Sequence, residues 1–408
     1  MTKQSPAHRH DILVIGGGMV GLTFAVTAAH HGFDVCVVDR EDPAAMLDVP
    51  FDGRASAIAH ASFQLLSVSG AWAEMSAHAQ PIHDIRVSDG DSKLFLHYDH
   101  RDLGELPFGY MVENRAIRRA LFTTATAHAG ITSRTNTTVE NLDRGVGAVV
   151  AGLSDGTEVR ATLAVAADGR FSPAREAAGI GVAGWSYPQS GIVCTVAHER
   201  DHRGIAHERF LPPGPFAILP LSGRRASLVW TEHGDLAPAI MALDDAGFAA
   251  EMRQRFGDFL GATEIVGPRW SYPLALHHAE RYIDNRLVLI GDAAHGLHPI
   301  AGQGLNLGFR DVAALVEVVV DASRLGLDIG DAHALERYQR WRRFDNVVLL
   351  SVTDGLNRLF SNDIDPIRLI RDLGLAAVDR LPALKRMFME HARGTVGKLP
   401  RLLAGEVL

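Results

Sequence analysis

The sequence predicts a mixed α/β fold, α+β overall, with a Rossmann-like ligand-binding domain, an inserted antiparallel sheet and a helical C-terminal tail. Three features predict it. Residues 11–39 follow the order strand, glycine-rich turn, helix, strand. Four apolar residues at 287–290 lead into a Gly-Asp pair, as a buried strand does before a turn. Four alternating or apolar runs bounded by Pro and Gly, at 191–197, 216–221, 226–231 and 269–276, are typical of antiparallel strands.

The segment 11–39 holds the first ligand-binding motif. Its first strand ends in a G-x-G-x-x-G pattern formed by Gly16, Gly18 and Gly21, and its second strand ends at Asp39. The glycines permit a tight turn and let a pyrophosphate approach the N-terminus of the helix that follows. Asp39 is then placed to accept a hydrogen bond from a ribose hydroxyl. The complete unit predicts a dinucleotide site.

Two later segments share parts of this unit. The stretch 179–184 also fits G-x-G-x-x-G, but it follows a predicted helix at 173–178, so it predicts a helix C-cap and a loop. At 164–167 an apolar strand runs into Asp168 and a glycine, and a helix start follows. This second strand-to-helix turn is therefore a candidate ligand contact.

Asp292 lies where the strand at 287–290 ends and feeds an amphipathic run that begins near Gly302 and Gly304. An acid at this place, with no metal-ligand cluster nearby, suits hydrogen bonds to the hydroxyls of a sugar-like chain. The start of the helix would stabilise a ring that becomes anionic on reduction. An ordinary turn with a capping Asp is the alternative.

The three motifs together resemble the flavin-dependent aromatic hydroxylases of the p-hydroxybenzoate hydroxylase type, although those usually carry Gly where this chain has Ala166. Further segments narrow the resemblance to the FAD-dependent hydroxylases of ubiquinone biosynthesis (UbiH/UbiF type), over about residues 10 to 395. These segments are 52–58, 213–220, 298–308 and 359–394.

This resemblance implies an FAD-dependent aromatic-ring monooxygenase that hydroxylates a polyprenylated phenol through a flavin C4a-hydroperoxide, with O₂ as co-substrate. The reductant would be NAD(P)H or a ferredoxin, which binds transiently because the chain has no second dinucleotide fingerprint. Two other functions stay open: another FAD aromatic hydroxylase or polyprenyl reductase, and a flavin-bearing assembly subunit. The resemblance also implies partners in a ubiquinone-biosynthesis complex, and a homo-oligomer stays open. The overall acidic balance argues against nucleic acid binding.

The expected FAD contacts combine the three motifs with positions that the resemblance adds. Arg54 stands where the family has a flavin-contacting arginine, and a solvated surface arginine is the alternative. Asn114 opens a helix where relatives carry a polar flavin-side residue, and an ordinary N-cap explains it equally well. The expected cofactor-binding residues are Gly16, Gly18, Gly21, Asp39, Arg54, Asn114, Asp168, Asp292, Pro299, Gly302, Gln303, Gly304, Leu305 and Asn306.

No general base is evident in the sequence. His298 is the one candidate for a catalytic role, and His295 is expected to make a structural hydrogen bond. Phe216, Leu219 and Pro220 are expected to line the substrate pocket, with plain core packing as the alternative for each.

Composition and strand positions suggest how the chain is organised. Its 408 residues are 47% hydrophobic, enough for a large core, and Cys36 and Cys194 lie far apart, which fits a reducing cytoplasm and no metal or disulfide. We expect a discontinuous FAD-binding domain, two segments of a substrate domain and a helical C-terminal region. The first comprises 8–75, 110–183 and 275–345, the second 76–109 and 184–274, and the third 346–408.

The C-terminal region differs in charge from the rest of the chain. Residues 337–408 carry thirteen Lys or Arg and eight Asp or Glu, whereas the whole chain has a net charge of −8. Asp365 and Pro366 are expected to start a helix with an apolar stripe, and Pro382 to start another. The stripe packs on the protein's own core in one interpretation. In the other, 365–408 contacts the inner membrane peripherally, and the protein is otherwise cytoplasmic.

Overall fold

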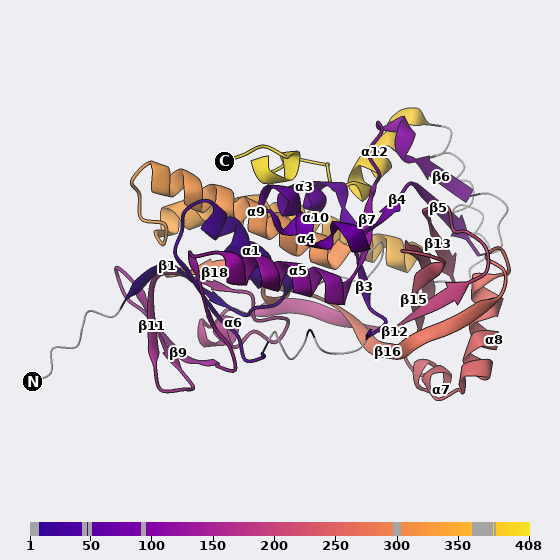
Figure 1. Cartoon of the computed structure of the whole chain (residues 1–408), viewed down its shortest axis with the longest axis horizontal. Helices are drawn as coiled ribbons and strands as arrows, with labels where there is room; N and C mark the ends of the chain where they lie inside the picture. The colour runs from indigo at the N-terminus through magenta and orange to yellow at the C-terminus, as the bar shows by residue number, and fades with distance from the viewer. Residues whose placement is uncertain are drawn as a thin grey trace, which may run out of the picture.

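In the computed structural model, residues 8–42, 47, 51–90, 95–296, 303–360, 378 and 381–408 are described. Within them, the strands form two sheets of eight strands and one of three. A mainly parallel sheet and a mainly antiparallel sheet occupy opposite ends of the molecule, and the small sheet lies between them (Figure 1). The predicted mixed α/β fold is confirmed.

The mainly parallel sheet has the order β17-β18-β11-β1-β2-β8, and a β9–β10 hairpin extends β11. Strands β18, β11, β1, β2 and β8 run parallel, so their carboxyl ends meet at one edge. β1 and β2 are almost fully buried, as their apolar sequences predict. The strands are β1 (Arg9–Ile15), β2 (Val35–Val38), β8 (Ile131–Arg134), β9 (Val139–Arg144), β10 (Val149–Leu153), β11 (Glu158–Ala166), β17 (Ile283–Asp284) and β18 (Leu287–Leu289).

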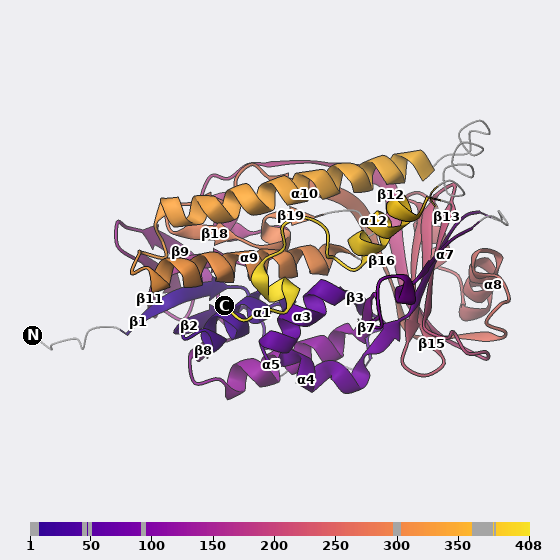
Figure 2. The ribbon, with the colours of Figure 1, turned by 90° about the horizontal axis from the view of Figure 1, so that it is seen from above.

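Helices pack around this sheet and connect it to the rest of the molecule. α1 contacts α5 and α9, and α10 runs along the length of the molecule, contacting β17 in one sheet and β14 in the other (Figure 2). These helices are α1 (Met19–His30), α3 (His60–Val68), α4 (Ala71–Met75), α5 (Asn114–Ala127), α6 (Pro173–Ala177), α9 (Gln303–Arg324) and α10 (Ala332–Phe360).

The predicted cap and loop at 179–184 are partly confirmed. α6 ends before Gly179, whose positive φ of 61° fits a helix C-cap, but the loop is short because a strand, β12, already begins at residue 182. The second G-x-G-x-x-G is therefore not a nucleotide turn.

The mainly antiparallel sheet has the order β19-β16-β12-β15-β14-β13-β5-β6, and only β13 and β5 pair in parallel. The four runs predicted as antiparallel strands lie within β12, β14, β15 and β16, which extend beyond the predicted bounds. The strands are β5 (Asp84–Asp89), β6 (Phe95–Asp99), β12 (Val182–His198), β13 (Ile205–Leu211), β14 (Gly214–Leu221), β15 (Arg225–His233), β16 (Thr263–Ala279) and β19 (His295–Gly296).

The two faces of this sheet pack against different elements. On one face, called the α8 face below, α7 (Ala237–Met241) and α8 (Asp245–Phe256) cover the sheet, and Phe248 contacts Trp230. On the other, called the inner face, Phe210 and Leu221 pack on the small sheet. The small sheet consists of β3 (Ala55–Ala59), β4 (Gln80–Ile82) and β7 (Gly109–Glu113).

The C-terminal residues that the structure describes pack on the protein's own core. α12 (Pro382–Ala392) begins at the predicted proline, and Met389 is buried beside the small sheet. Leu402 and Leu403 in the short helix η5 (Arg401–Ala404) are fully buried against the ligand-binding half. The helix predicted to start at Asp365 lies outside the described residues. The remaining short helices are η1 (Ser76–His78), η2 (His100–Asp102) and η3 (Gly291–Ala293).

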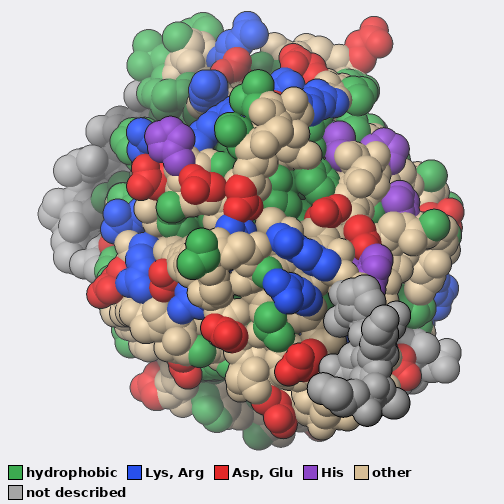
Figure 3. All heavy atoms as spheres, turned by 90° about the vertical axis from the view of Figure 1, so that its left-hand side faces the viewer, with side chains coloured by type: hydrophobic (Ala, Val, Ile, Leu, Met, Phe, Trp, Pro, Cys, Tyr) green, Lys and Arg blue, Asp and Glu red, His purple; other side chains and the backbone are tan. Residues whose placement is uncertain are grey.

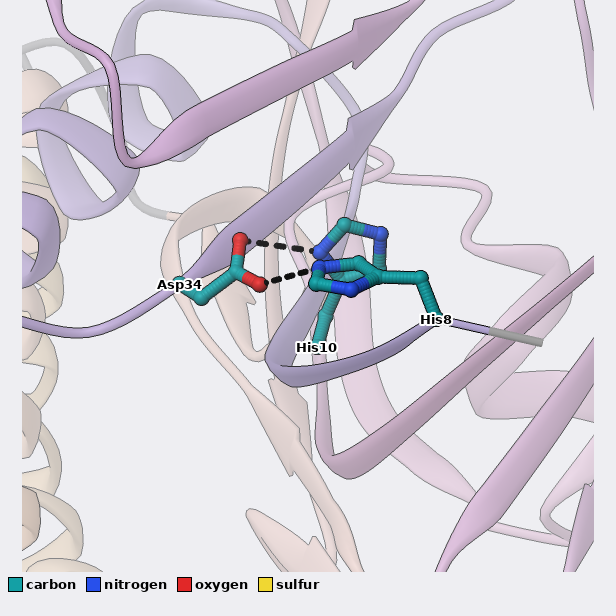
Figure 4. A group of neighbouring side chains, drawn as sticks. All are labelled: His8, His10 and Asp34. Atoms are coloured by element: carbon teal, nitrogen blue, oxygen red, sulfur yellow. Dashed lines mark hydrogen bonds and ion pairs between the residues drawn. The ribbon is translucent and has the colours of Figure 1, made fainter. Parts of the chain in front are cut away.

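The start of β1 is tied to the residue before β2 by two histidines. His8 and His10 each bind one oxygen of the Asp34 carboxylate, at 2.6 and 2.9 Å (Figure 4). The carboxylate of Asp11 accepts from the backbone N–H of Asp34. This corner lies at the opposite end of β1 from the glycine-rich turn, so it fixes the sheet rather than the ligand site.

The surface at the parallel-sheet end mixes acidic and basic side chains without a large area of either sign (Figure 3). Such a surface offers no broad electrostatic attraction to a polyanion. Among the helices of the described residues, none is long and apolar enough to span a bilayer.

Candidate functional site

A cavity of about 360 Å³ brings the fingerprint, the end of β2 and the Asp-Gly turn together. β1 pairs in parallel with β2 on one side and β11 on the other, so the three segments that follow these strands meet at one edge. The sequence motifs at 16–21, 39 and 168–169 are therefore parts of one site. The residues of the motifs that line the cavity are Gly16, Gly18, Asp39, Asp168 and Gly169.

The glycine-rich turn leaves the start of α1 open. Gly18 is the N-cap of α1, no side chain caps the helix, and a Cβ on Gly18 would have no atom within 4 Å. Gly16 has a φ of 104°, and its added Cβ would lie 2.5 Å from the carbonyl oxygen of Ala167. A Cβ on Gly21 would lie 1.9 Å from the carbonyl oxygen of Gly16. Free N–H groups and open space suit a phosphate.

Two acids flank this turn. The carboxylate of Asp39 accepts from the backbone N–H groups of Gly17 and, at 2.7 Å, Glu41, so it also holds the turn against the end of β2. Asp168 accepts from the N–H of Ala174 at 3.1 Å through Oδ2, whereas its buried Oδ1 has no partner among the described residues. Burial raises the pKa of Asp168 despite its hydrogen bonds to Ser172 and Ala174. A hydroxyl donor would satisfy Oδ1.

The Gly-Asp turn contacts the first turn of α1. Asp292 lies in η3, directly after β18, and Gly291 has a positive φ of 59°. An added Cβ on Gly291 would lie 3.2 Å from Val20, and one on Gly308 would lie 2.6 Å from it. The carboxylate of Asp292 is exposed and has no hydrogen bond within the described residues, although its backbone carbonyl accepts from His277 at 2.9 Å. The carboxylate is therefore free to bind a ligand.

A buried network beneath this turn involves residues that sequence reasoning missed. Asp311 on α9 is fully buried and accepts from the N–H of Gly291 at 3.0 Å, from His295 at 2.6 Å and from Nε of Arg342 at 2.8 Å. Burial alone would raise its pKa, but the charges and hydrogen bonds of His295 and Arg342 outweigh burial and hold it at about 2. The structural hydrogen bond predicted for His295 is confirmed.

The network extends to α10 and to Tyr282, the residue before β17. Nη2 of Arg342 donates to Asn346 at 2.6 Å, whose amide donates to the hydroxyl of Tyr282 at 3.0 Å. The hydroxyl of Tyr338 donates to the carbonyl oxygen of Leu289 at 2.9 Å, so α10 also binds the strand that precedes the turn. The Gly-Asp turn thus rests on a rigid, hydrogen-bonded support.

Comparison with known proteins places the chain in a family. The family described as "FAD binding domain" matches residues 9–343. Ubiquinone hydroxylase UbiL of Rhodospirillum rubrum is 53% identical over 399 residues, which cover 97% of this chain and 92% of that protein. The chain belongs to the family of FAD-dependent ubiquinone-biosynthesis hydroxylases.

Other members of this hydroxylase family match over nearly the whole chain. The 3-demethoxyubiquinol 3-hydroxylase of Escherichia coli is 37% identical, and the match covers 94% of this chain and 98% of that protein.

Among solved structures, p-nitrophenol 4-monooxygenase PnpA from Pseudomonas putida has a TM-score of 0.79 at 19% identity, over 96% of this chain and 99% of that one. That structure supports the fold alone.

The residues present fit the FAD of the hydroxylase family at the glycine-rich turn. The open N-terminus of α1 suits its pyrophosphate, the unpartnered Oδ1 of Asp168 suits a sugar hydroxyl, and the free carboxylate of Asp292 suits another. These features agree with a dinucleotide laid across the start of α1.

Two other expected FAD contacts, Arg54 and Asn114, bind protein atoms. Arg54 pairs with Asp52 at 2.7 Å and lies over the Trp270 ring, 4.8 Å from its centroid. Asn114 is the first residue of α5 and accepts from the hydroxyl of Ser56, so the N-cap alternative is wrong.

Asn306 uses its side-chain amide on a strand of the small sheet. Its oxygen accepts from the N–H of Ala59 at 2.9 Å, and its nitrogen donates to the carbonyl of Ala57 at 2.8 Å. This clamp holds β3 against α9. Gln303, Gly304 and Leu305 form the start of α9, whereas His298, Pro299 and Gly302 lie outside the described residues.

The three expected pocket residues do not share one face of the sheet. Phe216 lies opposite Trp230 in the core under α8, and Pro220 pairs with Ala226 on the same face. Leu219 points to the inner face, where it packs against the cluster beside the small sheet. Alternation along β14 causes the split. Core packing therefore explains Phe216 and Pro220, and only Leu219 stays a candidate for the pocket.

Replacing Asp292 with Ala is expected to weaken FAD binding about 10- to 100-fold, because charged hydrogen bonds to hydroxyls are lost. The fold should persist, since this exposed carboxylate makes no hydrogen bond or ion pair within the described residues. Flavin absorbance per protein after purification measures the effect. Asp235→Ala, at an exposed aspartate before α7, is the control. Full yellow occupancy of the Asp292→Ala protein would contradict the assignment.

Proposed function

We propose that this chain is an FAD-dependent monooxygenase that hydroxylates the aromatic ring of a polyprenylated phenol in ubiquinone biosynthesis. The meeting of the fingerprint, the Asp-Gly turn and the Gly-Asp turn at the start of α1 carries the proposal. Ubiquinone biosynthesis is proposed as the pathway from the names of two relatives that are 53% and 37% identical to this chain. Bound FAD would supply the chemistry that activates O₂, with NAD(P)H or a ferredoxin as the reductant.

In this proposal each part of the site has one task. The N–H groups after Gly18 bind the pyrophosphate. Asp39 and Asp168, which line the cavity, bind the adenosine side. Asp292, exposed in η3, binds the ribityl chain. The same proposal assigns 8–75, 110–183 and 275–345 to FAD binding and 76–109 and 184–274 to the substrate. The apolar inner face then excludes water from the reacting ring.

Analysis of quinone precursors in cells lacking this gene tests the function. A polyprenylated phenol that lacks one ring hydroxyl is expected to accumulate, and its structure identifies the carbon that is attacked. Unchanged ubiquinone with no precursor would contradict the proposal. O₂ consumption by the purified protein, coupled one to one to hydroxylated product, separates it from a polyprenyl reductase and from an assembly subunit.

We further propose that the C-terminal region contacts the membrane from which an apolar substrate would be drawn. Leu381, directly before α12, is 54% exposed, and Met387, within α12, is 49% exposed. Truncation before Asp365 would also remove the buried Leu402 and Leu403, so point substitutions are a sharper test.

The double variant Leu381→Ser/Met387→Ser is expected to pellet several-fold less with phosphatidylglycerol vesicles, because it removes exposed apolar area. Leu325→Ser is the control, since Leu325 is 75% exposed in the turn after α9. Equal pelleting of the double variant and the wild type would rule out contact through α12.

A further inference from the structure

β13 presents an acid on the inner face of the antiparallel sheet. His207 packs against the Phe259 ring, and Arg209 donates to the carbonyl oxygen of Arg255 on α8, so the odd-numbered residues point to the α8 face. Ala206 and Phe210 lie in the cluster on the inner face. Because side chains alternate along a strand, Glu208 points to the inner face between them.

The inner face packs against the small sheet, which lies next to the FAD site. Its cluster includes Met111 of β7, and Ala55 and Ala57 of β3 pack against it. β3 is the strand that Asn306 clamps to the start of α9. Glu208 is therefore on the side of the sheet where a substrate must lie to reach the flavin.

Three polar side chains on this face lack hydrogen-bond partners within the described residues. The carboxylate of Glu208 has no hydrogen bond or ion pair within the described residues and is only partly exposed. Along the same cross-strand row lie Ala217 and Val229, and the buried hydroxyls of the flanking Ser227 and Thr231 are also without partners in the described part of the chain. An apolar surface with a few unsatisfied polar groups is typical of a ligand pocket.

We propose that Glu208 accepts the hydrogen bond of the ring hydroxyl of the phenolic substrate and takes its proton as the ring is hydroxylated. This inference rests on the proposed function. In the proton step the O–H bond of the phenol breaks and an O–H bond of the carboxyl group forms, so the negative charge moves from Glu208 to the ring oxygen. A ring bearing that charge is a better nucleophile toward an electrophilic oxygen.

The ionisation of Glu208 suits this task. Burial raises the pKa of Glu208 to about 7. This pKa is closer to that of a phenol than the pKa of an ordinary glutamate is, and part of Glu208 is still ionised near neutral pH. Other titratable and charged groups lie on the elements around the inner face, within the residues that the structure describes. They are Asp89 on β5, Tyr98 on β6, Tyr272 on β16, the Arg225–Glu113 ion pair of β15 and β7, the Arg54–Asp52 ion pair before β3, Asp354 on α10, and Lys385, Arg386, Glu390 and His391 on α12.

Equilibrium binding to the FAD-loaded protein tests the proposal. The probes are 2-geranylphenol and its methyl ether, which lacks the donor hydroxyl, and the readout is the change in the flavin spectrum. The wild type should prefer the phenol by a factor that rises about tenfold between pH 6 and pH 8, because only the carboxylate accepts a charged hydrogen bond. In the Glu208→Gln variant the preference should be independent of pH.

Glu264→Gln is the matched control, because Glu264 is an exposed glutamate of the same sheet, on β16. It should keep the pH-dependent preference of the wild type. A preference that is the same at both pH values in the wild type, or that rises equally in the Glu208→Gln variant, would overturn the proposal. The wild-type measurement decides even if that variant does not fold.

Turnover distinguishes this proposal from the proposed function. With NAD(P)H and O₂, Glu208→Gln should form hydroxylated 2-geranylphenol about 100-fold more slowly than the wild type and lose the rise in rate through pH 7. If the wild type shows the pH-dependent preference but hydroxylates no phenol, the proposed function fails and the role of Glu208 in binding stands. If the wild type hydroxylates the phenol and Glu208→Gln equals it, Glu208 is not the proton acceptor.

Discussion

The Asp311→Asn variant is expected to lose about 3 to 5 kcal/mol of unfolding free energy. The substitution removes a fully buried charge and leaves the buried guanidinium of Arg342 paired only with the more exposed Asp345. One carboxylate oxygen also becomes an amide NH2 group, so the asparagine can no longer accept both from Arg342 on one side and from His295 and the N–H of Gly291 on the other. Denaturant unfolding of the two proteins at pH 7 measures the difference. FAD binding should weaken as well, because the Gly-Asp turn loses its support.

Asp321→Asn is the control on the same helix. Asp321 also binds two arginines, Arg337 and Arg401, but it is partly exposed, so its loss should cost less than about 1 kcal/mol. Equal losses in the two variants would mean that the buried network contributes no more than a surface ion pair.

The pH dependence of stability gives an independent check on Asp311. Its pKa is about 2 in the folded protein, below the ordinary value of 3.8, so its contribution is complete above pH 4 and is lost as the pH falls from 4 toward 2. Between pH 5 and pH 3 the wild type should lose about 1 kcal/mol more than Asp311→Asn. Parallel curves for the two proteins would show that Asp311 does not titrate in this way.

The parts of the site that sequence predicts are those made by neighbours in the chain. A strand, a glycine-rich turn and a helix are local, so Gly16, Gly18 and Asp39 could be assigned before the fold was known. The meeting of 16–21 with 168 follows from parallel pairing of β1 with β11, which is the expected arrangement for such motifs. The order of the strands along the chain is therefore enough to predict most of the fold of the ligand-binding half.

The parts that sequence does not predict depend on distant residues. Arg342 reaches Asp311 from another helix, and neither has a local pattern that distinguishes it from a surface residue. Glu208 stands between a histidine and an arginine, which is typical of an exposed strand, yet it points to the inner face of the sheet, as its neighbours Ala206 and Phe210 show. For Phe216 and Leu219, alternation predicts opposite faces, but only the packing of α8 shows which face is covered.

Alanine at Gly21 and at Gly18 should have different effects, and the difference locates the pyrophosphate. A Cβ at Gly21 would lie 1.9 Å from a backbone oxygen of Gly16, which cannot move without opening the turn. Gly21→Ala should therefore lose about 1 to 3 kcal/mol of stability and also FAD. A Cβ at Gly18 meets no protein atom within 4 Å, so Gly18→Ala should keep its stability to within about 1 kcal/mol.

FAD binding by Gly18→Ala is nevertheless expected to fall at least about 100-fold, because the new methyl group would occupy the space where a phosphate approaches the N–H groups of α1. Thermal unfolding of the apoproteins and titration with FAD separate the two effects. Gly355→Ala in α10 is the control, because an added Cβ there also meets nothing within 4 Å. It should lower neither the affinity for FAD nor the stability of the fold. Since the protein leaves room for a methyl group at Gly18, a loss of binding there can come only from the cofactor. A Gly18→Ala protein that is purified fully loaded with FAD would place the pyrophosphate elsewhere.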